Sequence, residues 1–321
     1  MIRILVQIAR IIVGVTFVFS GFVKLVDPLG SAYKFEEYFS EGVLNLEFLI
    51  PYALIFSIAL IIIELMLGIM LLIGWRPRFT SYSLLGISVV FLFLTWYSAY
   101  YDKVTDCGCF GDAITLSPWD TFYKNIVLTA LVIFILTKNF EISSLFGPIA
   151  MRWVPFLSLM GAMYITYYVL IHLPLIDFRP YAVGKDLNVG METFKEDGVP
   201  EVHDFSLESL EDDLTYELLA EEKVMLWISY DLDIADDNGF VTAKIVAGNA
   251  LKEGYRVYGV TASSDDLIEQ TIRRFSLPFE FLFCDATTLK TMIRSNPGLI
   301  ILNKGVVTDK SSWVDAMDTE L

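Results

Sequence analysis

Two cysteines separated by one residue are the side chains of this sequence best suited to chemistry. They lie in the run Cys107-Gly108-Cys109-Phe110-Gly111. A disulfide between them would close too small a ring to remove much entropy from the unfolded chain, and its geometry would be strained. A strained disulfide is easily reduced, and one sulfur can attack a partner while the other resolves the mixed disulfide. Gly108 and Gly111 would let the backbone bend around the pair. We therefore predict thiol–disulfide exchange at Cys107 and Cys109.

Two other interpretations of this loop stay open. Asp106 and Asp112 flank the cysteines, and their negative charges would raise the pKa values of the thiols and slow their attack at neutral pH. The pair could then be inert, or it could be half of a metal site. Because the nearby sequence offers no histidine and no second cysteine pair, we expect no metal.

Charged residues interrupt the apolar part of the chain. Arg10 and Glu64 lie inside apolar stretches, where an ionised group is costly unless it is paired. Counted at ~1.5 Å per residue, both lie on the same side of the membrane centre, and a long arginine side chain covers the difference in depth. We predict that Arg10 and Glu64 form an ion pair between two helices. The alternative is a proton relay or a quinone-headgroup site with Glu64 as the titrating group. Lys24 is expected to reach the headgroups or to pair with Asp27.

The third cysteine, Cys284, follows Phe281-Leu-Phe283 and is expected to end a strand. A lone cysteine beside apolar residues is usually a small buried hydrophobic residue. The alternative is a thiol that can reach the Cys107–Cys109 loop. The two histidines, His172 and His203, are too few and too separated in sequence to indicate haem or zinc, and no glycine-rich phosphate loop occurs.

Long apolar stretches must position the first two cysteines. Hydrophobic residues make up 55% of the 321-residue chain, and its mean hydropathy of +0.56 exceeds that of ordinary soluble proteins. A helix needs about 20 apolar residues to cross a hydrocarbon core of ~30 Å. Five stretches meet that length, near 4–26, 50–73, 80–100, 118–137 and 153–173. We predict five membrane-spanning helices with lipid as a partner.

The charges of the short loops predict the orientation of these helices. Lysine and arginine are retained on the cytoplasmic side, and six lie on one side against three on the other. The six are Arg3, Arg10, Arg76, Arg78, Lys138 and Arg152, and the three are Lys24, Lys34 and Lys103. The N-terminus is therefore predicted to be cytoplasmic, with the cysteine loop and the C-terminal domain outside. In a bacterial inner membrane that side is the oxidising periplasm.

Acidic residues are concentrated in the C-terminal part of the chain. The net charge is −16, and the segment from Arg179 onward has 13 Lys/Arg against 27 Asp/Glu. Such a segment repels nucleic acid and anionic lipid. We therefore exclude nucleic acid as a partner and expect a protein or a small molecule.

Several motifs of the first 140 residues occur together in a known family. These motifs are Arg10-x-x-x-Gly14, Phe19-Ser20-Gly21-Phe22-x-Lys24-Leu25-x-Asp27-Pro28, the segment from Glu64 through Gly68 to Gly74, and Cys107-Gly108-Cys109-Phe110-Gly111 after a third helix. The region resembles the DoxX-like membrane family, in particular the branch that includes the methylamine-utilisation protein MauE. The resemblance implies a four-helix bundle. It also implies roles such as disulfide formation in partner proteins or electron transfer that involves quinone.

Short strands alternate with helices in the C-terminal domain. Strands are expected at 223–230, 255–261 and 298–302, and helices at 240–253 and 264–275, which predicts an α/β domain with a central sheet. This order, with Pro297 directly before the third of these strands, resembles a thioredoxin-like fold over about residues 200–315. That family has a cis proline at this place. Where it carries Cys-x-x-Cys, this chain has the segment 230–237 without a thiol.

The predicted fold is thus a membrane all-α helical bundle followed by a soluble α/β domain. We expect a DoxX-like four-helix domain at 1–140, a fifth transmembrane helix and connection at 141–178, a linker at 179–199 and an acidic thioredoxin-like domain at 200–321. In the first functional hypothesis, Cys107 and Cys109 cycle while the C-terminal domain recruits a client, and quinone is a compatible acceptor. The rival is a non-enzymatic assembly or scaffold subunit, because a domain that keeps a fold without its chemistry is often a binding module.

Overall fold

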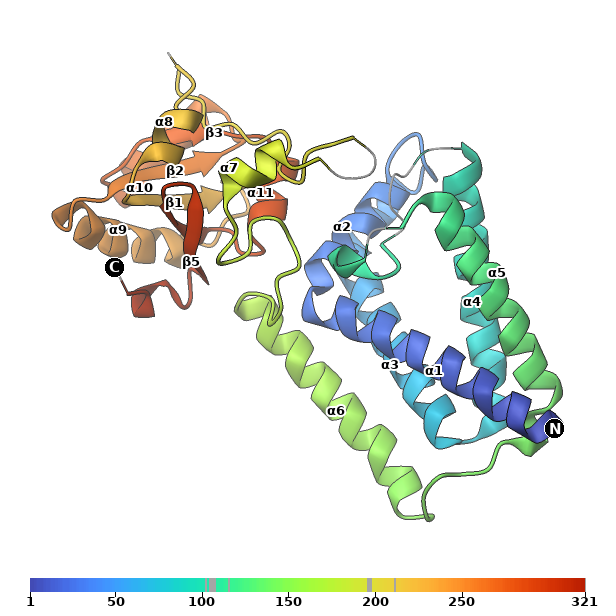
Figure 1. The fold of residues 1–321 in the computed structure, drawn as a ribbon. Coiled ribbons are helices and arrows are strands. Elements are labelled where there is room, and N and C mark those ends of the chain that lie inside the picture. The colour runs from blue at the N-terminus through green and yellow to red at the C-terminus, as the bar shows by residue number, and fades with distance from the viewer. Residues whose placement is uncertain (102, 104–107, 115, 195–197, 211, 321) are drawn as a thin grey trace. The chain divides into compact units, whose positions relative to one another are not determined.

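The structure is a computed structural model, and it describes every residue except 102, 104–107, 115, 195–197, 211 and 321. The chain divides into two compact units, Met1–Val169 and Leu170–Leu321, whose elements can be followed in Figure 1. Each unit is described by itself below.

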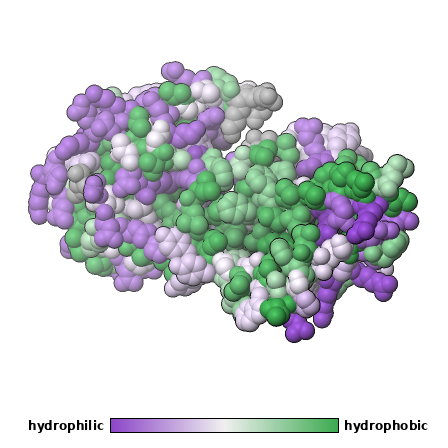
Figure 2. Space-filling view, turned by 60° about the horizontal axis from the view of Figure 1, so that its bottom comes forward, coloured by the Kyte–Doolittle hydropathy of each residue, from purple (hydrophilic) through white to green (hydrophobic). Residues whose placement is uncertain are grey.

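Helices make up the first unit. They are α1 (Ile2–Val26), α2 (Pro28–Phe39), η1 (Glu47–Tyr52), α3 (Ala53–Ile73), α4 (Pro77–Tyr101), η2 (Gly111–Ala113), α5 (Pro118–Thr137), η3 (Asn139–Glu141) and α6 (Ala150–Ile171). Among the described residues, five helices are long and apolar enough to cross a membrane, namely α1, η1 with α3, α4, α5 and α6. Figure 2 shows a broad hydrophobic surface over this unit. The prediction of five membrane helices in contact with lipid is confirmed, and the chain is a membrane protein.

Local sequence signals set the ends of these helices. The Asp27 side chain accepts a hydrogen bond from the Gly30 amide at the start of α2, and Pro28 takes the first helical position, where its missing amide hydrogen costs nothing. Ser117 and Pro118 begin α5 in the same way. At the other end of α3, Gly74 has φ +74°, a left-handed conformation that favours glycine.

Glycines bring α1 and α3 unusually close. A Cβ atom on Gly21 would lie 2.8 Å from the backbone nitrogen of Leu65, and one on Gly68 would lie 2.8 Å from that of Val18. Small residues let helices approach closely in membranes, where packing replaces the hydrophobic effect as the attraction between helices. The close approach places the polar side chains of α1 directly against those of α3.

A mixed five-stranded sheet forms the second unit. Its strands are β1 (Val224–Ser229), β2 (Arg256–Thr261), β3 (Phe281–Phe283), β4 (Gly298–Asn303) and β5 (Val306–Ser312), in the order β3-β2-β1-β4-β5. Strand β1 pairs parallel with β2, and β2 parallel with β3, whereas β4 pairs antiparallel with β1 and β5. The predicted α/β domain with a central sheet is confirmed.

Helices flank this sheet, and a hydrophobic core lies on each of its faces. The helices are α7 (Leu187–Glu192), α8 (Thr215–Ala220), α9 (Asp237–Lys252), α10 (Asp265–Phe275), α11 (Ala286–Met292) and η4 (Ala316–Asp318). One core includes Leu226 and Ile300, and the other includes Trp227 and Leu299. All six residues of β1 are buried, which explains why this strand is a continuous apolar run in the sequence.

The chain enters this unit through a segment that packs into it. Tyr181 and Leu187, from the segment that we expected to be a linker, belong to one of the two cores. Asp177 accepts hydrogen bonds from Arg179 Nε at 2.7 Å and from Lys310 Nζ at 2.7 Å. The side chains of Arg179 and Lys310 are 2% and 3% exposed, so this three-residue charge cluster is buried between the entering segment and β5.

Candidate functional site

The second half of the cysteine loop is docked on the helical bundle. Gly108 and Gly111 have φ values of +62° and +51°, and a Cβ atom at these positions would lie 3.1 Å from Lys34 Cγ and 3.2 Å from Val23 Cγ1, respectively. Both positions therefore favour glycine by conformation, and an added side chain would also be tight there. Cys107 lies outside the described residues. Cys109 is described, with a half-buried free thiol.

Aromatic and polar contacts hold this loop against α1 and α5. The Phe110 ring lies 5.5 Å from the Phe19 ring, and the Lys124 ammonium lies 4.0 Å from the Phe110 ring centre. The Ser20 hydroxyl donates a hydrogen bond to the Cys109 carbonyl oxygen at 2.7 Å. These contacts fix the backbone of Cys109 over the buried side chains of α1.

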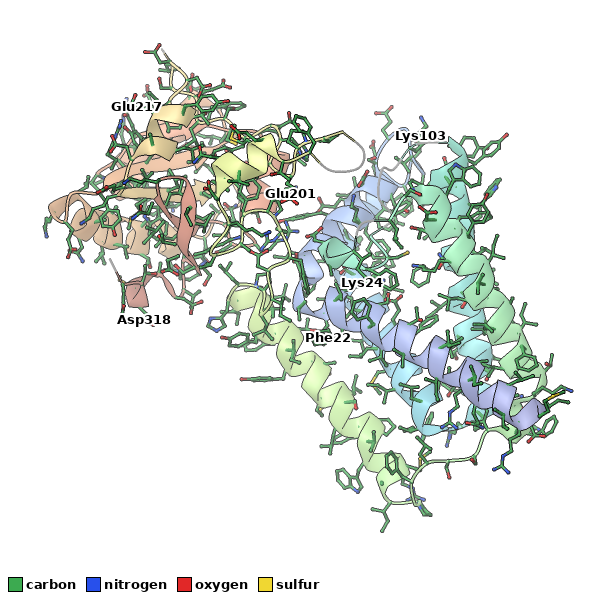
Figure 3. The ribbon with its side chains drawn as sticks, viewed as in Figure 1. Phe22, Lys24, Lys103, Glu201, Glu217 and Asp318 are labelled. Carbon is green, nitrogen blue, oxygen red and sulfur yellow. The ribbon has the colours of Figure 1, made fainter. Side chains whose placement is uncertain are left out.

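A buried ion pair lies directly beneath the loop. Lys24 points from α1 into the bundle (Figure 3), and its Nζ lies 2.8 Å from Glu64 Oε2 of α3. Lys24 Nζ also donates to Ser20 Oγ at 3.2 Å. Lys24 and Glu64 are 5% and 1% exposed. Ser20 therefore links the ion pair to the carbonyl of Cys109.

The predicted pairing of Arg10 with Glu64 is wrong. Arg10 instead donates to the backbone carbonyls of Leu71 at 2.9 Å, of Ser143 at 3.1 Å and of Leu72. These acceptors include the end of α3, where unsatisfied carbonyls and the helix dipole attract a cation. Lys24 is the partner of Glu64, so the expectation that Lys24 reaches the headgroups or pairs with Asp27 is also wrong. The error arose because depth in the membrane does not tell which face of a helix a side chain occupies.

Two small cavities open beside Cys109. One, of about 20 Å³, is lined by Cys109, Glu64, Ser88 and Asn125, among others. The other, of about 50 Å³, is lined by Cys109, Lys24 and Lys34 together with the rings of Phe35, Tyr38 and Phe91. Sequence reasoning missed Ser20, Ser88 and Asn125. Their signal was a polar side chain inside an apolar span, which usually faces the interior of a bundle.

The cysteine loop, the Lys24–Glu64 ion pair and the two cavities all lie within the part of the chain that resembles a known family. Residues 2–138 match the family model described as methylamine utilisation protein MauE. This MauE-like region runs from α1 to the end of α5 and contains the Cys107–Gly111 run, Lys24 and Glu64. No curated protein and no solved structure matches the chain.

Outside the MauE-like region, hydrogen bonds to Asn296 hold the loop that follows β1 in place. The Asn296 side chain accepts a hydrogen bond from Ser229 Oγ and donates one to the Asp231 carbonyl, both at 2.7 Å. The Asn296 carbonyl accepts one from the Asp236 amide at 3.0 Å. The Asn296–Pro297 peptide bond is cis and directly precedes β4. The loop that follows β1 is thus tied to the residue before Pro297, and it carries no thiol.

Cys284 lies far from solvent in the second unit. It follows β3 directly, as expected, and is fully buried. Burial raises the pKa of its thiol to about 11, and the negative charge of Asp285 adds to the shift. A buried neutral thiol is a poor nucleophile. This geometry favours the interpretation of Cys284 as a small hydrophobic residue. No group of three or more metal-ligating side chains occurs in the part of the chain that the structure describes.

Proposed function

We propose that this chain is a membrane thiol–disulfide protein that passes electrons from a client to a quinone through Cys107 and Cys109. The observation that carries the proposal is the position of Cys109. Its loop is fixed over a buried ion pair inside a MauE-like helical region, and it borders two cavities in the bundle. The hydrogen bond from Ser20 and the two glycines in left-handed conformation support this proposal, because they hold the loop in one place over the ion pair.

The proposed cycle balances as follows. A thiolate of the client attacks one sulfur of the Cys107–Cys109 disulfide, and a second client thiolate then releases the client with a disulfide of its own. The loop is left as a dithiol that holds two more electrons. A quinone accepts those two electrons together with two protons, and the loop disulfide forms again.

The cavity that Lys24 and Lys34 border suits the ring of a quinone. Its walls include Phe35, Tyr38 and Phe91, which offer apolar faces, and its two ammonium groups are hydrogen-bond donors suited to carbonyl oxygens. Cys109 borders the same cavity. When bound, the quinone would supply two-electron acceptor chemistry next to the dithiol. The residues present therefore fit a quinone.

We further propose that the second unit is a thioredoxin-like domain that binds the client without reacting with it. The strand order β2-β1-β4-β5, with parallel β1 and β2 and a proline before β4, supports this fold. Because the side chain of Asn296 already occupies the polar groups of the loop after β1, the client would bind elsewhere. An acidic groove of about 600 Å³, lined by Glu201, Asp204 and Asp285, suits a basic client segment, and Glu201 is labelled in Figure 3. The wider DoxX-like kinship and a periplasmic domain on a bacterial inner membrane belong to the same proposal.

Trapping the mixed disulfide tests this function. Changing only one loop cysteine, Cys107→Ala or Cys109→Ala, leaves a single thiol that can attack the disulfide of an oxidised client in the reverse of the last client step. Such a variant should accumulate a covalent client adduct that reductant releases, because the second loop sulfur that would displace the client is missing. The double variant should form none. Cys284→Ala is the matched control and should behave like the unchanged protein. Samples are first quenched with acid to stop thiol exchange, then alkylated and analysed by mass spectrometry.

A scaffold or assembly subunit is the rival function, and the thiol-free loop after β1 favours it. In that case neither single variant accumulates an adduct. The double variant then also complements a deletion strain as well as the unchanged gene does. That result would overturn the redox proposal.

A further inference from the structure

The buried carboxylate of Glu64 has one well-paired oxygen and one poorly paired oxygen. Oε2 accepts a hydrogen bond from Lys24 Nζ at 2.8 Å. Oε1 lies 3.4 Å from Ser20 Oγ, which is longer than an ordinary O–H···O hydrogen bond of roughly 2.5–3.0 Å. Ser20 has a single hydroxyl hydrogen, and the Cys109 carbonyl at 2.7 Å receives it. Among the described residues, Glu64 Oε1 therefore lacks a well-placed donor.

A second polar group borders the same space. Ser88 of α4 is 4% exposed, and its hydroxyl has no hydrogen-bond partner among the residues that the structure describes. Leaving such a group buried and unpaired is destabilising. Ser88 and Glu64 both line the cavity of about 20 Å³ that also borders Cys109. A cavity of roughly 10–15 Å³ is enough for one water molecule if polar groups surround it.

We propose that this cavity holds a water molecule that connects Cys109 to Glu64, and that Glu64 takes up the thiol proton during oxidation of the loop. The inference rests on the proposed function and names the proton path of the same site. Ser88 accepts from or donates to the water, and the water donates to Glu64 Oε1. Glu64 is thus a proton carrier for Cys109, acting through the water.

The proton balance agrees with the cycle. Conversion of the dithiol to the disulfide releases two electrons and two protons, and the quinone takes up both. One of these protons leaves the Cys109 thiol, passes through the water to the Glu64 carboxylate, and leaves again when the quinone is reduced. While Glu64 is neutral, Lys24 keeps the Ser20 oxygen at 3.2 Å and the Phe91 ring at 5.2 Å, so its charge still has partners.

The charged and titratable groups around Glu64 come from several elements. Lys24 of α1 is its ion-pair partner, and Lys124 of α5 and Cys109 of the loop border the same cavity. From α4, the lining residues Ser88 and Phe91 carry no charge. Among the described residues, Glu64 is therefore the carboxylate that lines this cavity, which makes it the proton acceptor that we assign to Cys109.

Rates of loop oxidation test the path. The full chain, reduced and reconstituted in nanodiscs, is mixed with a soluble short-chain quinone, and the dithiol that remains is alkylated at intervals. Glu64→Gln should slow oxidation at saturating quinone by about 10²-fold, a typical loss for a missing proton acceptor, without changing the KM for quinone. Glu64→Asp should restore much of the rate. Ser88→Ala should slow it by about fivefold, as one lost hydrogen bond predicts.

Two controls separate proton transfer from a structural role. Ser81→Ala removes another buried hydroxyl of α4 that has no partner among the described residues and does not line this cavity, and it should leave the rate unchanged. The double variant Lys24→Met with Glu64→Leu removes both charges and so restores a neutral, packed bundle. Because Lys24 also lines the proposed quinone cavity, the rate of the double variant is compared at saturating quinone, where it should stay as slow as Glu64→Gln. If it oxidises at the unchanged rate, the ion pair is only structural and the inference is wrong.

The outcome also distinguishes this inference from the proposed function. If the loop of the unchanged protein never oxidises with quinone, the proposed function fails. If it oxidises, and Glu64→Gln does so equally fast, only the proton path fails.

Discussion

Replacing Lys310 by methionine should abolish a pH dependence of stability in the second unit. Burial, followed by repulsion from Arg179, lowers the pKa of Lys310 to about 7, although Asp177 opposes the shift. Lys310 is thus nearly neutral when folded above pH 7 but charged when unfolded up to its ordinary pKa of 10.5. Between these values the unfolded chain binds more protons, so the free energy of unfolding rises with pH.

The magnitude follows from the two pKa values. With about 7 in the folded state and 10.5 in the unfolded state, linkage gives a gain of about 2 kcal/mol between pH 7 and pH 9. Below pH 7 Lys310 is mostly charged in both the folded and the unfolded chain, so the destabilisation caused by its buried charge changes little with pH. In Lys310→Met this gain should vanish. Asp177 keeps its hydrogen bonds to Arg179 Nε and Nη2 at 2.7 and 2.9 Å. The lost bond to the Tyr181 carbonyl costs the same at every pH.

Hydrogen exchange of the β5 amides measures this difference. After correction for intrinsic exchange, the protection of these amides in the unchanged protein should rise roughly 30-fold from pH 7 to pH 9, which corresponds to about 2 kcal/mol. Lys310→Met should show no such rise. Lys304→Met is the matched control, because Lys304 is 63% exposed at the turn before β5, and it should follow the unchanged protein. Equal slopes in Lys310→Met and the unchanged protein would refute the reasoning.

Two further predictions concern packing and thiol access. Gly68→Ala should destabilise the detergent-solubilised protein by about 1–3 kcal/mol, because the new Cβ meets the backbone of Val18 at 2.8 Å. In Gly86→Ala the added Cβ would meet no heavy atom of the described residues within 4 Å outside its own stretch of helix. This variant should melt like the unchanged protein, and equal melting of both variants would contradict the close packing. Cys284 should be alkylated far more slowly than Cys109, because a pKa of about 11 leaves roughly a thousandth of its thiol ionised at pH 8. Equal labelling of both thiols by mass spectrometry would show that Cys284 is accessible.

Elements with strong apolar patterns could be predicted from the sequence, and elements without them could not. The five spans and β1 follow from runs whose length and hydropathy allow few alternatives. Strand β5 has the polar sequence Val-Val-Thr-Asp-Lys-Ser-Ser. It lies at an edge of the sheet, where pairing with a neighbouring strand decides the structure.

The partner of Glu64 could have been predicted from the sequence. Lys24 lies three residues after Gly21, and Gly68 lies four residues after Glu64. On a helix, such spacings place residues on one face. Glycine faces pack against each other in membranes, so both charges had to meet where α1 and α3 touch. The cavity beside Ser88 has no such signal, because it depends on how α4 and α5 are placed.

The burial of two cations also changes how the membrane insertion signal is counted. Arg10 is held by carbonyls at the end of α3 and Lys24 by Glu64, so neither is a loop charge that translocation machinery would have to retain. When Arg10 and Lys24 are left out of the count, five loop cations lie on one side and two on the other. The five are Arg3, Arg76, Arg78, Lys138 and Arg152, and the two are Lys34 and Lys103. The proportion favouring a cytoplasmic N-terminus rises. A chain in which Glu64 is removed would leave Lys24 as an unpaired positive charge on the side that we predict to be outside, and it would weaken the predicted orientation signal.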